Sequence, residues 1–235
     1  MSKNDCPQTL NPTAALNEIE LFSDIDESVR EEIAKLVKWK SLKSGVEVVA
    51  HQASTDEVYF IASGRVRATV YTLNGKEISY QELGEGEMFG ELSAIDHLPR
   101  TVNVITVKPS QIGVIQAGDY WHLIERYPEI AAASLKRLAR IIRFLIDRVY
   151  QYGALDVKDR VRMEVLRLAQ DDTEGGDTVE IIDFPTHKEI ASRVNTHREA
   201  VTRELNELSR MGLIQQQHRV MVVTSITGLE QLLSE

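Results

Sequence analysis

Hydrophobic and polar positions change their spacing along the chain, and each change predicts a different kind of element. Residues 18–38 repeat apolar positions with the spacing of a helix. Residues 41–115 instead alternate short β-branched stretches with glycine-containing turns, a pattern typical of a barrel or roll, and Asn74-Gly75 predicts a two-residue hairpin turn. The predicted strands cover residues 46–49, 58–61, 66–71, 78–83 and 102–107.

A long helical pattern follows, from about residue 117 to residue 152. Apolar residues form one stripe along this segment that steps alternately by four and three positions. The stripe consists of Ala131, Leu135, Leu138, Ile142, Leu145, Val149 and Tyr152. This is the spacing of a coiled-coil seam, sustained for about three heptads. Because charged residues flank the stripe, we predict that the helix pairs with a second copy of the chain rather than packing on its own domain.

The last third of the chain predicts a small helical domain with a β-hairpin. Its expected elements are a hinge at 153–156, a helix at 160–169, two further helices, a hairpin of 213–216 with 219–223, and a last helix at 226–233. Helices followed by a two-stranded wing are typical of a winged helix-turn-helix. We therefore expect an α+β fold. Its parts are a loose leader over 1–17, a β-roll over 18–126, the long helix over 127–153 and the winged domain over 154–235.

Composition narrows the class of protein. The 235 residues are 43% hydrophobic, enough for a real core, and no apolar run approaches the roughly 18–20 residues that span a bilayer. The start of the chain lacks the build of a signal peptide, so we expect a cytoplasmic protein with no membrane partner. The single cysteine, Cys6, excludes disulfides within the chain and thiolate metal clusters. No set of residues resembles a metal site or a catalytic nucleophile, so we expect neither a metal nor an enzyme.

The net charge of −9 argues against a partner as acidic as nucleic acid. The charge is, however, distributed unevenly along the chain. Residues 186–219 contain six Lys and Arg against four Glu. Residues 154–184, just before them, contain four Lys and Arg against nine acidic residues. A basic surface is therefore confined to one short segment.

Two predicted helices in this basic segment have the pattern of a helix-turn-helix. Thr186 and Thr196 each begin a capping box with a glutamate three residues later, and Asn195 stands at the turn, where a left-handed backbone is needed. The positions predicted to face inward are Ile190, Ala191, Val194, Val201, Leu205 and Leu208.

The outward face of the second helix carries the chemistry of base recognition. Arg198 and Thr202 share one row near its N-terminus, and Glu199 and Arg203 share the next. Arginine donates two hydrogen bonds to guanine, and glutamate accepts one from cytosine, so this face predicts a recognition helix in the major groove of double-stranded DNA. The residues better placed for phosphates are Lys188, Thr196 and His197.

A second constellation lies in the predicted roll, where Phe89-Gly-Glu-Leu-Ser-Ala94 is followed by Pro99-Arg-Thr101. Gly90 allows backbone amides to approach an anion at the start of a short helical turn. Arg100 offers a two-pronged donor to a phosphate, and Glu91 is an acceptor suited to a ribose hydroxyl.

These motifs together resemble the CRP/FNR family of bacterial transcription regulators, and within it the cyclic-AMP receptor branch. The likeness covers about residues 21–223, and three stretches carry it: 89–101, 127–157 and 197–203. The resemblance implies a jelly-roll-like cyclic-nucleotide-binding β-roll and a homodimer. It also implies binding to a palindromic TGTGA-type DNA site, which Arg198, Glu199 and Arg203 would read.

In that family, the first stretch is the phosphate-binding cassette of the nucleotide site. The resemblance assigns the ribose 2′-hydroxyl to Glu91, the cyclic phosphate to Arg100, and a place beside the phosphate and base to Thr101. The remaining cassette residues that it implies are Phe89, Gly90, Leu92 and Ser93.

One part of the pattern departs from the cyclic-AMP receptor. Leu145 and Ile146 stand where that protein has a Thr-Ser pair that contacts the adenine amine, and neither side chain forms hydrogen bonds. Thr101 also matches a threonine of cyclic-GMP-dependent kinases. We therefore expect cyclic AMP, cyclic GMP or both as effector, and no prosthetic group.

The sequence leaves two other functions open, a haem sensor and a cyclic-nucleotide-dependent enzyme or regulatory subunit. A family member that senses haem would need axial ligands, for which His51, His97 and His122 are available, whereas one cysteine cannot hold an iron–sulfur cluster. A cyclic-nucleotide-dependent enzyme or regulatory subunit would leave the helix-turn-helix without a role.

The resemblance also implies a possible partner for the acidic loop 171–177, which lies where the family contacts RNA polymerase.

Overall fold

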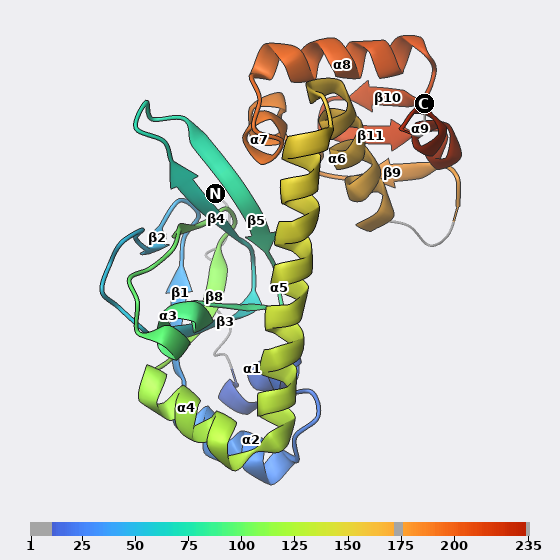
Figure 1. The fold of residues 1–235 in the computed structure, drawn as a ribbon. Helices are drawn as coiled ribbons and strands as arrows, with labels where there is room; N and C mark the ends of the chain where they lie inside the picture. Colours follow the sequence, from blue (N-terminus) through green and yellow to red (C-terminus); the bar gives the residue numbers. More distant parts are fainter. Residues whose placement is uncertain (1–10, 172–175, 234–235) are drawn as a thin grey trace, which may run out of the picture. The chain divides into compact units, whose positions relative to one another are not determined.

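The computed structural model describes residues 11–171 and 176–233, which form two compact units (Figure 1). The first unit comprises Met1–Val70 and Tyr80–Ile142, and the second comprises Tyr71–Ser79 and Arg143–Glu235. Helices and strands are mixed as predicted. The second unit includes the last turns of the long helix, where Arg148 and Tyr152 bond to the backbone carbonyl of Arg193.

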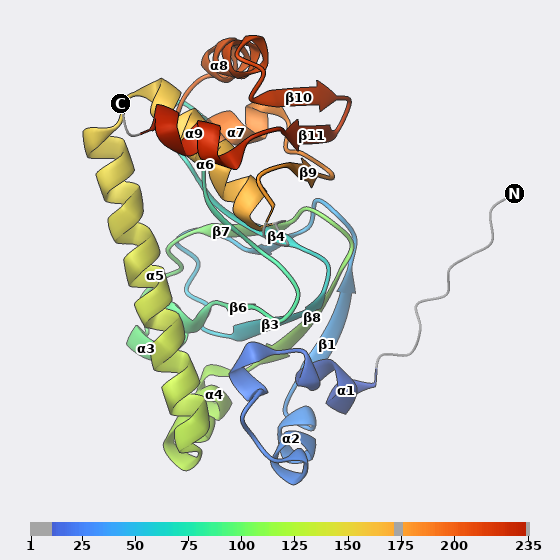
Figure 2. The same ribbon diagram turned by 90° about the vertical axis from the view of Figure 1, so that its right-hand side faces the viewer.

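Two four-stranded antiparallel sheets form the predicted β-roll, and Figure 2 shows them face to face. Their orders are β1-β8-β3-β6 and β2-β7-β4-β5. The strands are β1 (Lys38–Leu42), β2 (Glu47–Val49), β3 (Val58–Ser63), β4 (Val66–Tyr71), β5 (Glu77–Leu83), β6 (Met88–Phe89), β7 (Asn103–Thr106) and β8 (Ser110–Ile115). Apolar side chains from both sheets, such as Ile61, Val104 and Ile112, share one buried cluster. The two sheets of the roll therefore pack on each other through a shared hydrophobic core.

All five predicted strands are present, and three more were not predicted. β1 is largely exposed and polar, β6 has only two residues, and β8 is interrupted by a glycine. A Cβ on Gly113 would lie 2.7 Å from Val37 and 3.0 Å from the Trp39 ring, so the side chains that pack there require the glycine.

The prediction of a two-residue turn at Asn74-Gly75 is wrong. The backbone N–H of Thr72 donates to the carbonyl of Lys76 at 2.9 Å, which closes a longer loop between β4 and β5. Gly75 has a φ of 73°, so the glycine still supplies a left-handed position in that loop.

Helices cover one end of the roll and bury a second core around Phe22, Ile33, Phe60 and Tyr120. They are α1 (Pro12–Asn17), the 3₁₀ turn η1 (Glu20–Phe22), α2 (Glu27–Ala34), α3 (Glu91–Asp96) and α4 (Ala117–Arg126). The prediction of a loose leader over 1–17 is wrong for residues 12–17, because they form α1, which is capped by Asn11 and buries Leu16. Residues 1–10, including Cys6, lie outside the described residues. The single helix predicted over 18–38 is also wrong, since it is divided between η1 and α2.

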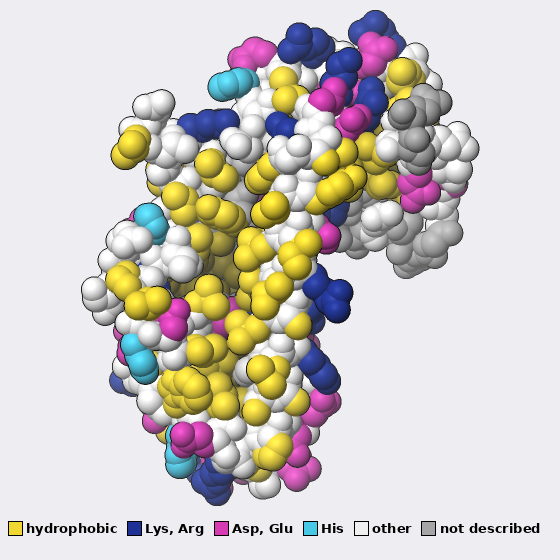
Figure 3. Space-filling view, viewed as in Figure 1, with side chains coloured by type: hydrophobic (Ala, Val, Ile, Leu, Met, Phe, Trp, Pro, Cys, Tyr) yellow, Lys and Arg dark blue, Asp and Glu magenta, His cyan; other side chains and the backbone are white. Residues whose placement is uncertain are grey.

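The long helix α5 spans Pro128–Ala154 and is separate from α4. Tyr127 has an extended backbone (φ −122°), as expected for a residue before proline, so the continuous helix predicted from 117 is wrong. Most of the predicted seam is exposed in the single chain: Val149 is 72% exposed, and Leu135 and Ile142 are also exposed. Figure 3 shows hydrophobic side chains gathered along α5.

The second unit contains the predicted winged domain. Its elements are α6 (Val157–Asp171), β9 (Val179–Ile181), α7 (His187–Arg193), α8 (Arg198–Arg210), β10 (Ile214–Gln217), β11 (Val220–Val223) and α9 (Ile226–Leu232). The strands form a sheet of order β10-β11-β9, in which β9 was not predicted. All six positions predicted to face inward are buried in one cluster with Phe184 and Met221. No helix in the described parts of the chain is long and apolar enough to cross a membrane.

Candidate functional sites

The first site forms where β6 leads into α3. Gly90 stands between them as the N-cap of α3, with a φ of 89° that favours glycine. A Cβ at this position would lie 2.7 Å from the Glu57 carbonyl oxygen and 2.8 Å from Nη1 of Arg100. The close approach of these groups therefore requires a glycine at residue 90.

Arg100 lies at the centre of this site and is only 2% exposed. Its Nε donates to Oγ1 of Thr55 at 2.9 Å, Nη1 to the Gly90 carbonyl at 2.9 Å, and Nη2 to the Glu57 carbonyl at 2.8 Å. Among the described residues its carboxylate partner is Glu57, whose Oε2 lies 3.4 Å from Nη2. A guanidinium has five N–H groups, so these bonds fix its orientation and leave donor capacity for an anion.

An aromatic pair supports the guanidinium. The Tyr59 ring stacks on Phe89 with centroids 4.8 Å apart, and Cζ of Arg100 lies 5.6 Å from the Tyr59 centroid. Burial, together with the negative charge of Glu57, raises the pKa of Tyr59 above its ordinary value. Neither Tyr59 nor Glu57 was predicted as a site residue, although both lie in or beside the predicted strand 58–61.

Glu91 is also buried, and its Oε1 accepts a hydrogen bond from Nε of Arg137 at 3.1 Å. Arg137, on α5, donates in addition to the carbonyl of Met88. The hydrogen bond from Arg137 therefore holds in place the Glu91 carboxylate, which the sequence predicts to accept a ribose hydroxyl. Of the other predicted residues, Ser93 is buried, whereas Leu92 and Thr101 are exposed at the rim of the cassette. Leu145 and Ile146 are exposed on the part of α5 that belongs to the second unit.

The second site is the helix-turn-helix formed by α7 and α8. The capping box at Thr186 is confirmed: its backbone N–H donates to Oε2 of Glu189 at 2.8 Å, and its Oγ1 accepts from the Glu189 N–H. Asn195 has the predicted left-handed backbone, with a φ of 51°. The second capping box is wrong, because α8 begins one residue later and its N-cap is His197. Thr196 is only 8% exposed, which removes it from the surface predicted to meet phosphates.

Side chains along α8 line one surface depression of about 500 Å³. They are Arg198, Glu199, Thr202, Arg203, Asn206 and Arg210. The first four were predicted, and the last two extend the same rows by one and two turns, a signal available in the sequence. Thr202 is partly committed within the domain, since its hydroxyl lies 2.8 Å from Nδ1 of His187 and donates to the Arg198 carbonyl. Lys188 and His197 are exposed nearby.

The described residues were also compared with the requirements of a metal site, and the end of the acidic loop has contacts of its own. Among the described residues, no group of three or more His, Cys, Asp or Glu side chains is arranged to hold a metal ion. Most of loop 171–177 lies outside the described residues. Asp177 at its end binds α9: its Oδ1 accepts from the Thr227 N–H at 2.7 Å and its Oδ2 from the Ser225 hydroxyl at 2.9 Å.

Two family models match the chain. A cyclic nucleotide-binding domain matches residues 39–127, and a Crp-like helix-turn-helix domain matches residues 137–232. The chain belongs to the CRP/FNR family of transcription regulators. The two matches enclose the Arg100 site and the α7–α8 site, respectively. This CRP/FNR chain is therefore a DNA-binding transcription regulator with a cyclic-nucleotide-binding domain.

Individual relatives agree with the family. The CRP-like cAMP-activated global transcriptional regulator of Mycobacterium tuberculosis is 27% identical over 205 residues, which cover 87% of this CRP/FNR chain and 92% of that protein. The cyclic AMP receptor protein of Thermus thermophilus is 29% identical over 175 residues, covering 74% and 78%. The structure of a CooA mutant from Carboxydothermus hydrogenoformans superposes with a TM-score of 0.79 at 16% identity, covering 92% of this chain and 95% of that one. The last likeness concerns the fold alone.

Proposed function

We propose that this regulator is a homodimer that binds a palindromic TGTGA-type DNA site when it is loaded with cyclic AMP or cyclic GMP. The observation that carries the proposal is the buried, oriented guanidinium of Arg100 beside the left-handed Gly90. Its carboxylate partner, Glu57, is 3.4 Å away and partly exposed, so the positive charge is only weakly matched. A buried cation with donor capacity favours an anionic ligand, and a cyclic phosphate suits this two-pronged donor.

This chain has polar side chains for the ribose and the phosphate of a cyclic nucleotide, but few for the base. Both candidate nucleotides share the ribose and the cyclic phosphate, which Glu91 and Arg100 would hold equally. At the positions that the family uses for the adenine amine, Leu145 and Ile146 provide only apolar contact. This argues for a sensor that accepts either purine.

The homodimer is supported by the exposed apolar stripe on α5. Leu135, Ile142 and Val149 follow one another at heptad spacing, and all three face solvent in the single chain. A contiguous apolar stripe of this kind marks an interaction site, and its spacing suits a parallel partner helix. Two copies related by a twofold axis would present two recognition helices, which accounts for a palindromic DNA site.

Calorimetry with cyclic AMP and cyclic GMP tests the nucleotide site, and fluorescence anisotropy with a palindromic TGTGA-type duplex tests DNA binding. We expect either nucleotide to strengthen DNA binding, and sedimentation to give a dimer. Arg100→Gln should weaken nucleotide binding by about 2–3 kcal/mol, whereas Arg126→Gln, at an exposed arginine of the same unit, should not. Equal nucleotide affinity in the parent protein and Arg100→Gln would overturn the proposal.

A further inference from the structure

Asn206 of the recognition helix α8 is a residue whose type the fold does not explain. It lies four residues before the helix ends at Arg210, and its side chain is exposed. Within the described parts of the chain, the side-chain amide has no hydrogen-bond partner. Asparagine is a weaker helix former than alanine, lysine or glutamate, and this position is too far from either end of α8 to cap it. An asparagine here is therefore better explained by a partner outside the chain.

Asn206 lines the same surface depression as the four residues of α8 that are predicted to meet DNA. It lies three residues after Arg203 and four after Thr202, so it stands one helical turn further along the same face. Arg210, the next lining residue, forms an ion pair with Glu207 on the same helix. The amide of Asn206, in contrast, keeps both its donor and its acceptor for a ligand in the depression.

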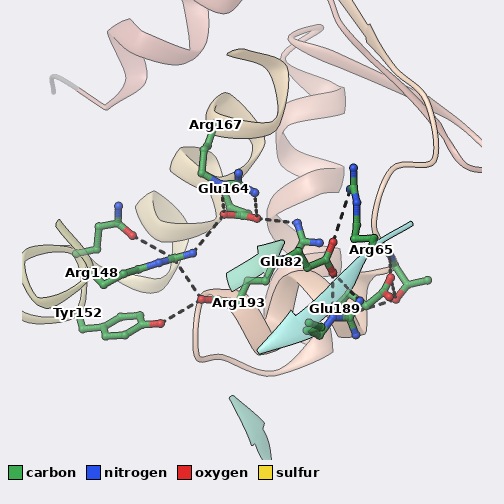
Figure 4. Close-up of polar contacts among 11 residues, drawn as sticks. Arg65, Glu82, Arg148, Tyr152, Glu164, Arg167, Glu189 and Arg193 are labelled. Atoms are coloured by element: carbon green, nitrogen blue, oxygen red, sulfur yellow. Dashed lines mark hydrogen bonds and ion pairs between the residues drawn. The ribbon is translucent and has the colours of Figure 1, made fainter. Parts of the chain in front are cut away.

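The outward direction of this side chain is fixed by the packing of α8. Val201, Leu205 and Leu208 are buried in the core of the winged domain, so the opposite side of the helix faces outward. The neighbouring α7 is held in turn by an ion pair between Nη1 of Arg193 and Oε1 of Glu164 on α6, at 3.1 Å (Figure 4). Side chains on such rigid elements hold a precise recognition geometry better than side chains on loops.

The spacing of side chains along α8 matches the spacing of base pairs in the proposed TGTGA half-site. Arg198 and Arg203 are five residues apart, a rise of about 7.5 Å along the helix. The two guanines of the half-site are two steps apart, which is about 6.8 Å. Asn206 lies about 4.5 Å beyond Arg203, close to one further step of about 3.4 Å. Whichever guanine Arg203 reads, the next pair beyond it is an A·T pair, because TGTGA begins with T and ends with A.

We propose that Asn206 is a specificity-determining residue that reads the adenine of the A·T pair next to the guanine read by Arg203. This inference rests on the proposed function, in which Arg198 and Arg203 read the two guanines. The amide donates to N7 of adenine and accepts from its N6 amine, and adenine alone presents this acceptor and donor together in the major groove. Asn206 thus extends the base readout of α8 by one A·T pair.

The test measures DNA affinity by fluorescence anisotropy on duplexes in which the first or the last pair of each half-site is changed to G·C, with cyclic AMP or cyclic GMP at saturation. The parent should prefer A·T at one end pair, and Asn206→Ala should lose that preference, by about fivefold or more per half-site. Asn206→Arg should instead favour guanine in place of that adenine. Ser209→Ala is the control, at an exposed residue of α8 that is not among those lining the depression, and should keep the parent's preference.

The outcomes separate this inference from the proposed function. An unchanged preference in Asn206→Ala, or an equal loss on all duplexes, which would indicate a phosphate contact, overturns the inference alone. If thermal unfolding shows that Asn206→Ala does not fold, Asn206→Arg decides, and a retained preference for A·T there overturns the inference. Arg203→Ala identifies the guanine that Arg203 reads, and an effect of Asn206 at the opposite end of the half-site also overturns it. A parent protein that binds the TGTGA-type duplex no better than a scrambled duplex overturns the proposed function, and the inference with it.

Discussion

Nε of Arg162 lies 2.6 Å from Oε1 of Glu204, which joins α6 to the recognition helix through the interior of the winged domain. Both side chains are largely buried. Because the bond ends on α8, it fixes the helix that carries the predicted base contacts. The pair therefore links the stability of the domain to the geometry of its DNA-binding face.

Replacement of one partner should be costly. In Arg162→Met, the carboxylate of Glu204 would stay buried without its partner, and we expect a loss of about 3–5 kcal/mol in the free energy of unfolding. Arg210→Met is the control, because Arg210 pairs with Glu207 on the surface, where an ion pair contributes at most about 1 kcal/mol. Urea denaturation measures both. Equal small losses would show that the buried pair contributes no more than the exposed one.

Glu57 should limit nucleotide affinity. Its carboxylate lies 3.4 Å from Arg100 and so competes with a phosphate for the same guanidinium. Glu57→Gln should tighten binding of cyclic AMP and cyclic GMP by about three- to tenfold, or about 1 kcal/mol, as measured by calorimetry. Asp56→Asn, at the exposed neighbouring residue, should have little effect. Weaker binding by Glu57→Gln would mean that the carboxylate chiefly orients Arg100.

Cyclic AMP and cyclic GMP should bind with similar affinity. Since Leu145 and Ile146 offer no hydrogen bonds, we expect the two dissociation constants to lie within about tenfold, or about 1.4 kcal/mol. Titration of each nucleotide into the DNA-free protein measures the difference. A gap of about a hundredfold or more would require a polar group that reads the base.

Acid should destabilise the winged domain through Glu164. Burial alone would raise the pKa of Glu164, but hydrogen bonding and positive charge from Arg167, with the charges of Arg193 and Arg148, hold it below its ordinary value of 4.5. Since the folded pKa lies below the unfolded one, the carboxylate stabilises the fold in full above about pH 4.5, and this contribution is lost as the pH falls through the folded pKa. Urea denaturation of the parent protein and Glu164→Gln across this range should give a steeper pH dependence for the parent. Parallel curves would contradict the assignment.

The arginines of α8 should affect DNA sequence preference, and Lys188 should not. Arg198→Ala and Arg203→Ala should each cost about 1–3 kcal/mol and relax the preference at one base pair per half-site. Lys188→Ala should weaken binding to all sequences alike and reduce its salt dependence. Gel shifts on substituted duplexes distinguish these effects. A uniform loss in the arginine variants would indicate phosphate contacts only.

Local patterns predicted most elements, because each depends on residues close in sequence. Five strands, the capping box at Thr186 and the left-handed Asn195 were predicted from residue type and spacing. β6 has only two residues, too few to show a pattern, so only its pairing with the distant β3 establishes it.

The polar contacts of the sites were harder to predict, because they join distant parts of the chain. Arg100 bonds to Thr55 and Glu57, and no periodicity connects residues so far apart. Glu164 did leave a signal: it falls between Val161 and Val165, on a stripe of α6 that is otherwise apolar and buried. A charged residue at such a position needs buried partners, but the sequence does not say which arginines provide them.

The continuity of α5 limits how the length of this protein can change during evolution. Ile142 and Arg143 are consecutive residues of one helix, yet they belong to different units. Inserting a single residue there would turn the second half of the stripe by about 100° relative to the first, so Leu135 and Val149 would no longer share a face. Seven inserted residues make about two turns and restore the alignment. Relatives with a longer or shorter α5 should therefore differ from this chain by numbers of residues that make nearly whole turns, such as seven.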